Sequence, residues 1–357
     1  MTTLAIPSSR ELPLYENGQS WYGKDLQQRT DWIHELSDDE QREVHQAVAR
    51  AIAGEVDLVA MKAEDFPLAT LGARLKVIGH DLKHGRGFAL IRGLDTMELT
   101  LVEKAYAFRG VGAHFGEAVS QNAKGHVLGH VANLGLDYSD PTTRGYQTPA
   151  ELRFHTDAAD IVGLMCIRGA RSGGLSRIAS STTVWNEAVR RRPDLAAELL
   201  RSYSFTRWGE VRPGQRPYFH IPLFHAHEGR MIAVFVAGAI EKGQALPGVE
   251  PLEPRQRDAI AFVNELASED GIRLDMAFQP GDMQFLCNHS ILHSRTSYED
   301  WPEPERRRHL LRLWLACPDG PSLPDYMTTE FQGRTVSGRP DGIRLPGVEL
   351  KANLYPD

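Results

Sequence analysis

Residues 306–317, RRRHLLRLWLAC, alternate along a run of bulky side chains in the way that a β-strand does. Successive side chains on a strand point to opposite sides, so one face of this strand would carry Arg308, Leu310, Arg312 and Trp314. A buried guanidinium is costly unless it meets an anion, ideally a carboxylate that it binds through two parallel hydrogen bonds. If this face is the inside of a barrel, Arg308 predicts a bound carboxylate there. Arg306 and Arg307 are expected to be solvated, as charge runs usually are.

Two other segments carry side chains that could hold a metal ion. His155 and Asp157 stand two residues apart in FHTD (154–157), so on a strand both project to the same side. His293 follows 136 residues after Asp157, in NHSILHSR (288–295). Two imidazoles and one carboxylate can hold a non-heme Fe(II) by one face and leave the other face open. With 14 histidines and 47 acidic residues, an H-x-[DE] match also arises by chance, so the hypothesis depends on the combination with Arg308.

Two longer stretches connect these residues to a known family. FHTDAADIVGLMCIRGARSGGLSRIAS (154–180) and PGDMQFLCNHSILHSRTSYEDWPEPERRRHLLRLWL (280–315) resemble the iron(II)/2-oxoglutarate-dependent oxygenases of the taurine dioxygenase and clavaminate synthase-like superfamily. GRGFALIRGL (85–94) gives weaker support. The resemblance implies a mainly β fold with flanking helices (α+β), built on a double-stranded β-helix, or jelly-roll, core.

The resemblance also implies roles for individual residues. The ligands of Fe(II) would be His155, Asp157 and His293. Arg308 would hold the distal carboxylate of the cosubstrate 2-oxoglutarate, assisted by Ser176, and O₂ would be the second cosubstrate. Arg312 matches a position that contacts substrate in several members of the family.

The segment 120–150 is rich in Gly, Asn, Asp and Thr and shows little periodicity. It is expected to be a long loop, and loops of this length tend to be functional lids. In similar oxygenases this segment lines the substrate pocket, so Asn133 and Gln121 are candidate substrate contacts. His289 would share the face of His293 on a strand and is a further candidate pocket residue.

The implied reaction couples oxidative decarboxylation of 2-oxoglutarate, to succinate and CO₂, with oxidation of a C–H bond. The predicted substrate is a small polar or carboxylated metabolite whose anionic group Arg312 would bind. Hydroxylation, desaturation and dealkylation remain open, because all three begin with the same hydrogen abstraction. Two alternatives are a hydroxylase of a carrier- or peptide-bound amino acid and a catalytically silent jelly-roll binding protein. The intact triad together with Arg308 argues against the silent protein.

Composition narrows the partners and the location. A net charge of −7 and a pI near 6.1 give no basic footprint for nucleic acid. No apolar stretch is long enough to span a membrane, and no signal or transit peptide is apparent. Three cysteines, an odd number without regular spacing, favour buried reduced thiols and a cytoplasmic protein. A homo-oligomer is left open.

The 357 residues, 41% hydrophobic, are predicted to form one oxygenase domain. Within it, residues 1–84 form a helical and irregular extension packed on the core, 85–320 form the jelly roll, and 321–357 form a tail on the surface. A capping box at Ser37–Glu40 predicts a helix to about Ala53. Further helices are predicted at 68–83, 99–115 and 254–268, and two surface helices at 182–191 and 193–202. Strands are predicted at 88–91, 152–158, 161–168, 203–208, 219–224 and 230–236, with the apolar run 231–240 read as a core strand.

Overall fold

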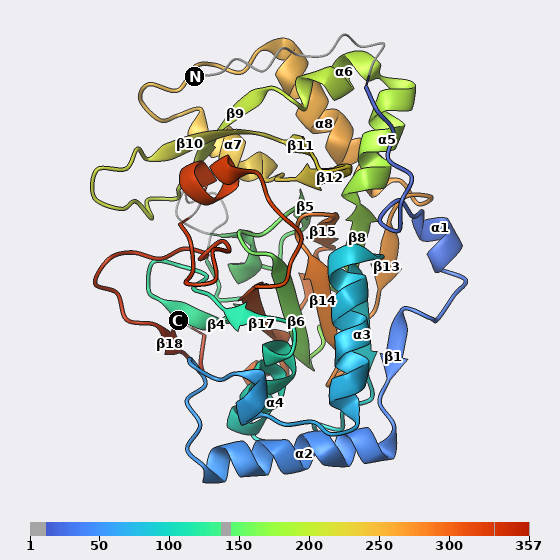
Figure 1. Ribbon diagram of the computed structural model, residues 1–357, viewed down its shortest axis with the longest axis vertical. Coiled ribbons are helices and arrows are strands. Elements are labelled where there is room, and N and C mark those ends of the chain that lie inside the picture. The colour runs from blue at the N-terminus through green and yellow to red at the C-terminus, as the bar shows by residue number, and fades with distance from the viewer. Residues whose placement is uncertain (1–11, 137–143, 332, 357) are drawn as a thin grey trace.

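The strand predicted from RRRHLLRLWLAC forms as β17 (His309–Ala316), and every residue in it is buried. The computed structural model describes residues 12–136, 144–331 and 333–356 (Figure 1). Strand β17 lies within an eight-stranded sheet of order β1-β2-β14-β6-β17-β4-β18, and β3 also pairs with β17. The bounds are β1 Ile33–Glu35, β2 Phe88–Arg92, β3 Glu117–Ala118, β4 His126–Ala132, β6 Ile161–Arg168, β14 Met283–Cys287 and β18 Lys351–Ala352.

A four-stranded sheet of order β13-β8-β15-β5 forms the second wall of the barrel. Its members are β5 Leu152–His155, β8 Ser176–Ser180, β13 Leu274–Met276 and β15 Ile291–Arg295. Apolar side chains from both sheets form one buried cluster, which includes Val162, Ile178, Leu286, Ile291 and Trp314. The two sheets therefore enclose a common interior, as the predicted jelly roll requires.

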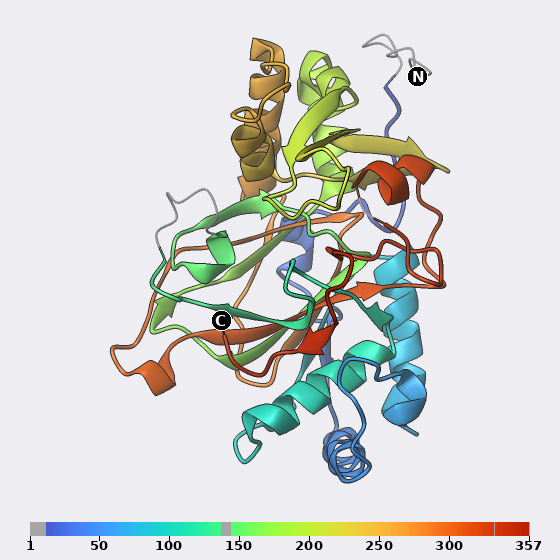
Figure 2. The same ribbon diagram turned by 90° about the vertical axis from the view of Figure 1, so that its left-hand side faces the viewer.

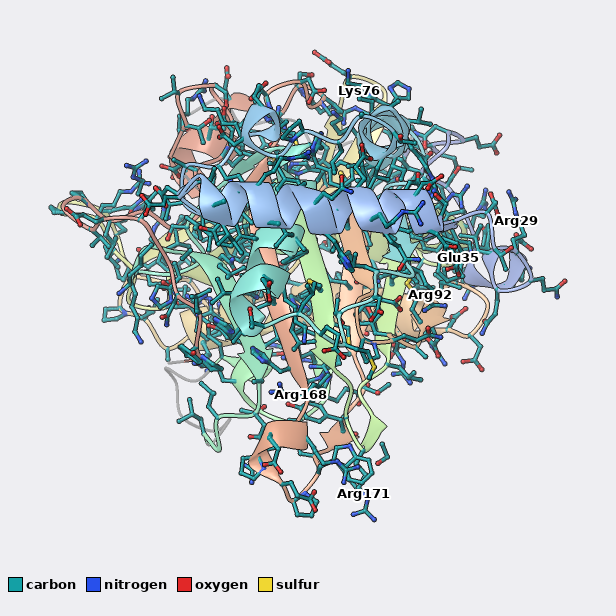
Figure 3. The ribbon with its side chains drawn as sticks, turned by 90° about the horizontal axis from the view of Figure 1, so that it is seen from below. Arg29, Glu35, Lys76, Arg92, Arg168 and Arg171 are labelled. Carbon is teal, nitrogen blue, oxygen red and sulfur yellow. The ribbon has the colours of Figure 1, made fainter. Side chains whose placement is uncertain are left out.

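Three helices cover the other face of the large sheet: α2 (Asp38–Ala53), α3 (Leu71–His84) and α4 (Leu101–Ala113). The capping box predicted at the start of α2 is present, with Ser37 and Glu40 bonded reciprocally. Phe108 of α4 packs in one buried cluster with Leu311 and Leu313, which face away from the barrel interior. Figure 3, seen from below, shows α2 lying across the molecule in front of α4 and the strands. Its labelled Glu35 and Arg92 are register partners in the parallel pair β1–β2.

A second group of elements caps the open end of the barrel (Figure 1). It contains α5 Ser181–Arg191, α6 Pro193–Glu198, α7 Ala237–Gly243, α8 Pro254–Ser268, β9 Ser202–Thr206, β10 Tyr218–Pro222, β11 Phe224–His227 and β12 Arg230–Ala233. The hairpins β9–β10 and β11–β12 are both antiparallel. Their apolar side chains form a third buried cluster with Trp185 and Val263 from the helices.

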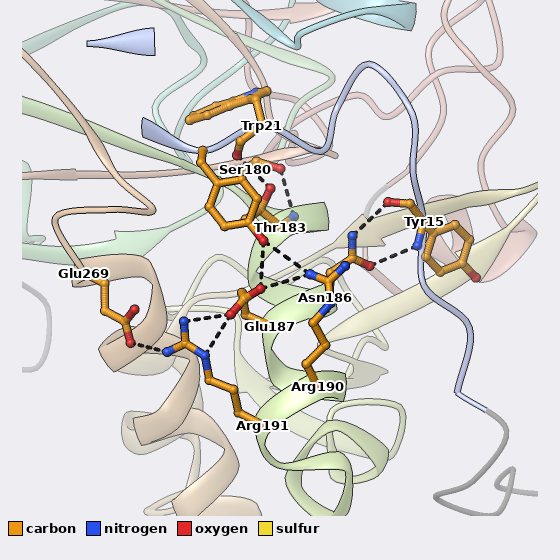
Figure 4. Close-up of polar contacts among 10 residues, drawn as sticks. Tyr15, Trp21, Ser180, Thr183, Asn186, Glu187, Arg190, Arg191 and Glu269 are labelled. Carbon is orange, nitrogen blue, oxygen red and sulfur yellow. Dashed lines mark hydrogen bonds and ion pairs between the residues drawn. The ribbon is translucent and has the colours of Figure 1, made fainter. Parts of the chain in front are cut away.

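The prediction that α5 lies on the surface was wrong. Its first eight residues, Ser181–Ala188, are all buried. The N-terminal segment packs along this helix: the Asn186 side chain accepts from the Tyr15 N–H and donates to the Tyr15 carbonyl (Figure 4). A distant segment thus covers a face that the local sequence pattern presents as solvent-exposed.

The remaining elements are short. They are α1 Gly23–Leu26, β7 Ser172–Gly173, β16 Tyr298–Glu299, 3₁₀ turns at Ala63–Asp65, Gly145–Gln147 and Pro304–Arg306, and a π-helix at Met327–Phe331. Among the described residues, no helix has both the length and the apolar character needed to cross a membrane.

Three further expectations are corrected by the structure. Within 120–150, β4 pairs with β17, so the segment is not all loop; residues 137–143 lie outside the described residues. The apolar run 231–240 begins as β12 but continues into α7. The tail does not simply cover the surface, because Arg339 is buried against Asp160, with Nη2 to Oδ1 at 2.6 Å. In Figure 2 the C-terminal segment, drawn in red, runs from the cap to β18, the edge strand that pairs with β4.

Candidate metal and cosubstrate site

The three predicted metal ligands come together at the mouth of the barrel. Strands β5 and β15 are antiparallel, and His155 lies directly opposite His293, with ring centroids 4.2 Å apart. Asp157 follows two residues after His155, just beyond the end of β5. One ligand atom from each of these three side chains lies within 4.8 Å of the others. The two strands therefore form a compact N,N,O donor set.

Neighbouring groups orient these donors in a way that suits a metal ion. Nδ1 of His155 lies 2.9 Å from the Arg153 carbonyl, so it carries the proton and leaves Nε2 with a free lone pair. The indole N–H of Trp314 donates to Oδ2 of Asp157 at 2.9 Å. Such partners fix ligand orientation before a metal binds. The donor set and its supports therefore fit Fe(II), which favours two imidazoles and a carboxylate.

The protonation states also favour binding. Burial, reinforced by the nearby His155, lowers the pKa of His293 to about 3, so this imidazole is neutral near pH 7. Burial alone would raise the pKa of Asp157, but Arg312, the two histidines and the Trp314 hydrogen bond outweigh it and lower the pKa. A neutral imidazole and an ionised carboxylate are the forms that coordinate metals.

Beside the metal ligands, a buried cationic region fits a carboxylate. Arg308 and Arg295 both lie over the Tyr298 ring, with guanidinium carbons 5.0 and 4.6 Å from its centroid. Nη1 of each is buried and has no hydrogen-bond partner among the described residues. Ser176, on β8, lines the same cavity and donates to Oε1 of Gln284 at 3.2 Å. Because a buried unpaired donor is costly, the unpartnered Nη1 atoms indicate an anionic ligand such as the distal carboxylate of 2-oxoglutarate.

Arg312 points into the cavity from the same face of β17. Its guanidinium carbon lies 4.5 Å from the Tyr146 ring centroid, and Nη1 lies 3.7 Å from Oδ2 of Asp157. Its Nε donates to Oε1 of Gln121 at 2.7 Å, and the Gln121 amide donates back to the Arg312 carbonyl at 2.8 Å. Gln121 is therefore placed behind Arg312 and away from the wall of the main cavity.

The two other candidates lie outside this cavity. Oδ1 of Asn133 accepts from the Gly135 N–H at 2.9 Å, so this side chain closes a local turn. His289 lies in the turn before β15, and its Nε2 is 2.7 Å from Oδ1 of Asp160. Arg339 contacts the same carboxylate, so His289 belongs to a buried network around Asp160.

The cavity that contains these groups has a volume of about 270 Å³. Its outer wall comes from parts of the chain that sequence reasoning missed, namely Arg207, Trp208, Arg212, Phe331 and Arg344. These residues belong to the β9–β10 connection, the π-helix and the C-terminal segment, which are far apart in sequence. Arg295 could have been found, because it stands two residues after His293 on β15 and so faces the same way.

Comparison with known proteins places this geometry in a family. The model of the family described as taurine catabolism dioxygenase TauD, TfdA family, matches residues 50–314. The chain belongs to this family. It is accordingly a dioxygenase that uses Fe(II) and 2-oxoglutarate, and the predicted family, fold and enzyme class are confirmed.

Two curated proteins are similar over most of their length. FR-33289 synthase of Streptomyces rubellomurinus is 29% identical over 324 residues, which cover 90% of this chain and 95% of that protein. The taurine hydroxylase-like protein SAT17 of Stachybotrys chartarum is 29% identical over 307 residues, which cover 82% and 77%.

Solved structures share the fold at lower identity. An asparagine oxygenase in complex with Fe(II), 3-hydroxyasparagine and succinate matches with a TM-score of 0.62 and 16% identity, covering 80% of this chain and 93% of that one. The non-heme iron oxygenase OrfP, in complex with Fe, succinate and (3S)-hydroxy-L-Arg, matches with a TM-score of 0.62 and 13% identity, covering 87% and 99%.

Proposed function

We propose that this dioxygenase hydroxylates a small polar or carboxylated metabolite, with His155, Asp157 and His293 holding Fe(II). Arg308, with Ser176, binds 2-oxoglutarate. One observation carries the proposal: the three metal ligands and Arg308 line the same cavity. Nη1 of Arg308 is buried and has no described hydrogen-bond partner. Fe(II), when bound with 2-oxoglutarate, supplies the oxidising chemistry.

The chain's own residues select and orient the substrate. Gln121 fixes the guanidinium of Arg312 by the 2.7 Å bond to Nε, which leaves its outer edge free to bind an anionic group. Apolar residues, among them Phe205, Val234 and Leu345, line much of the remaining wall and exclude water.

A free small molecule is favoured over a carrier-bound one by the neighbouring structures. The asparagine oxygenase holds 3-hydroxyasparagine, and OrfP holds (3S)-hydroxy-L-Arg, both of them free amino acids. We place the reaction in the cytoplasm, because Cys166, Cys287 and Cys317 are all free and buried.

The test is succinate formation from 2-oxoglutarate with anaerobically added Fe(II), ascorbate and O₂, across a panel of amino acids, sulfonates and carboxylic acids. His155→Ala and Asp157→Ala are expected to abolish turnover while the fold is retained. His45→Ala is the control, because its Nε2 bonds to the Asp95 carbonyl and it lies far from the cavity in the helical layer. Retained succinate production in both ligand variants would refute the metal assignment.

A further inference from the structure

The wall of the cavity contains many more arginines than carboxylates. The arginines that line it are Arg144, Arg153, Arg207, Arg212, Arg295, Arg308, Arg312 and Arg344. Within the described part of the chain, the acidic residues that line it are Asp157 and Glu210. Such an excess of one sign, in a partly enclosed space, predicts a ligand of the opposite sign.

Three of these arginines are neutralised by carboxylates. Arg144 pairs with Glu210. Arg153 pairs with Glu241 at 2.6 Å, and Arg212 pairs with Asp341 at 2.9 Å. At the inner end of the cavity, the distal carboxylate of 2-oxoglutarate would neutralise the charges of Arg308 and Arg295. The charges left over belong to Arg312, whose partner Asp157 is shared with the metal, and to Arg207 and Arg344.

Arg207 lies at the end of β9 and has no carboxylate within ion-pair distance in the described ranges. It donates from Nη1 to the Phe331 carbonyl at 3.1 Å and from Nη2 to the Glu330 carbonyl, and its Nε is buried without a described partner. Burial lowers the pKa of Arg207 to about 10, with a smaller contribution from nearby Arg212, while the Glu330 carboxylate acts in the opposite direction. Its positive charge is thus held in the cavity wall without a direct ion pair in the described ranges, and the nearby Glu330 carboxylate offsets part of it.

Arg344, at an exposed position, brings a second charge without a described ion pair to the same outer wall. Its carbonyl accepts from Nε of Arg212 at 2.8 Å, which fixes the backbone of the C-terminal segment against the β9–β10 connection. The side chain of Arg344 forms no ion pair with any residue that the structure describes. Arg212, itself paired with Asp341, therefore joins the segment that carries Arg344 to the connection that carries Arg207.

We propose that Arg207 and Arg344 form a second anion-binding subsite, so that the substrate is a small dianion with an anionic group at each end. One end is bound by Arg312 near the metal and the other by the outer wall. This inference rests on the proposed function and deepens it by specifying the charge of the substrate.

The same charge distribution disfavours a free amino acid. A substrate ammonium group needs a carboxylate, but Asp157 belongs to the metal site. Glu210 already accepts from Arg144 and, through Oε1, from the Ala123 N–H at 2.9 Å. A dianion with no ammonium group fits the described wall better than the zwitterions held by the neighbouring structures.

A purely structural role for Arg207 is the competing explanation. Its bonds to the carbonyls of Glu330 and Phe331 stabilise the end of the π-helix Met327–Phe331, as cations near helix C-termini do. That role does not involve Arg344, so testing both residues separates the two explanations.

The experiment is calorimetric titration of Mn(II)-loaded protein saturated with 2-oxoglutarate. The probes are 4-phosphonobutyrate as the dianion with two charged ends, pentanoate as a monoanion, and 4-aminobutylphosphonate as the molecule that carries an ammonium group. The dianion should bind at least about tenfold more tightly than either other probe, the scale of one well-placed ion contact. Arg207→Gln and Arg344→Gln should each remove about tenfold of that preference, and Arg207→Lys should restore part of it.

Arg216→Gln is the matched control. Arg216 is exposed on the same β9–β10 connection, stacks on Tyr218 at 5.3 Å and does not line the cavity, so its loss should leave dianion binding unchanged. The proposal is overturned if the dianion binds no more tightly than pentanoate, if the ammonium probe matches it, or if neither cavity variant weakens it. Should Arg207→Gln fail to fold, Arg344→Gln alone decides. Absence of metal-dependent 2-oxoglutarate binding would instead refute the proposed function, and it is measured first.

Discussion

A single unpaired atom, Nη1 of Arg308, indicates most about what this cavity binds. Arg308 lies against Tyr298 and is buried, and burial lowers its pKa from the usual value for a guanidinium. Burying a charged group away from water costs on the order of several kcal/mol, unless a ligand supplies an anion as its partner. The fold therefore holds Arg308 in a state that a bound anion would relieve, as the proposed binding of 2-oxoglutarate requires.

Arg308→Ala should weaken 2-oxoglutarate binding on the order of 100-fold, because it removes a charge-assisted contact in a desolvated site. Metal binding should be unaffected, since Arg308 is not one of the three grouped ligands. Anaerobic titration of the Fe(II)-protein with 2-oxoglutarate, followed by its visible absorbance, measures the change.

The control for this variant is Arg307→Ala, which removes an exposed charge from the adjacent position. An unchanged cosubstrate affinity in Arg308→Ala would transfer the role to Arg295 or Arg312.

Gln121 acts through Arg312, so its loss should weaken binding of the substrate more than binding of the cosubstrate. Gln121→Leu removes the 2.7 Å bond to Nε of Arg312 and leaves that guanidinium free to rotate. We expect KM for the substrate to rise roughly tenfold, the usual worth of one hydrogen bond to a charged group. The 2-oxoglutarate KM should change little, and steady-state kinetics with each component varied in turn would show it. Equal increases in both constants would contradict a role confined to Arg312.

At the scale of elements, the two strands that carry the chemistry were predictable from local pattern. The alternation through β17 and Arg308, the residue just before it, gives Arg308, Leu310 and Arg312 one face, and these side chains line the cavity as that periodicity predicts. The spacing of His155 and Asp157 likewise predicts that they project together; the two donors do lie together, although β5 ends at His155 and Asp157 lies just beyond it. Period-2 alternation suffices here because a strand that faces a barrel interior has only two sides.

The outer wall could not be predicted in this way. Arg207, Phe331 and Arg344 lie in three segments whose approach depends on how the hairpin β9–β10 and the C-terminal segment pack together. Strand β4 was missed for a related reason: glycine and histidine obscure its pattern, and pairing with β17 stabilises it. Non-local pairing determined these elements, and a single sequence holds little information about it.

A buried ion pair helps to hold the C-terminal segment in position. Both Arg339 and Asp160 are buried, and Nε and Nη2 of Arg339 contact the two carboxylate oxygens at 2.8 and 2.6 Å. Arg339→Met should lower the free energy of unfolding by about 3 kcal/mol, because it leaves a buried carboxylate short of a partner. Chemical denaturation measures this loss.

Arg334→Met provides the comparison on the same segment. Arg334 pairs with Asp325 at 3.5 Å in an exposed position, so its loss should change stability by less than about 1 kcal/mol. Comparable effects of the two variants would show that the Arg339 pair does not anchor the segment.

At the scale of the whole molecule, buried histidines make stability depend on pH. Burial lowers the pKa of His225, in the cap, to about 3, and the pKa of His309, on β17, is also lowered to about 3. The unfolded chain protonates these histidines below about pH 6.5, whereas the native protein does not. Each therefore favours unfolding as the pH falls from about 6.5 towards 3, by about 1.4 kcal/mol per pH unit.

His225→Gln tests this sign. Between pH 6.5 and 5 the parent protein should lose about 2 kcal/mol of stability through His225 alone, and the variant should not show that component. The change in slope is the readout, because Gln also disturbs the 2.5 Å contact of His225 with the Tyr326 hydroxyl and so lowers stability at every pH. Urea unfolding at several pH values separates the two effects. His80→Gln, at an exposed position on α3, should keep the parent slope. Equal slopes for the parent and His225→Gln would mean that His225 becomes protonated in the folded protein, and hence that the cap opens to water before the molecule unfolds.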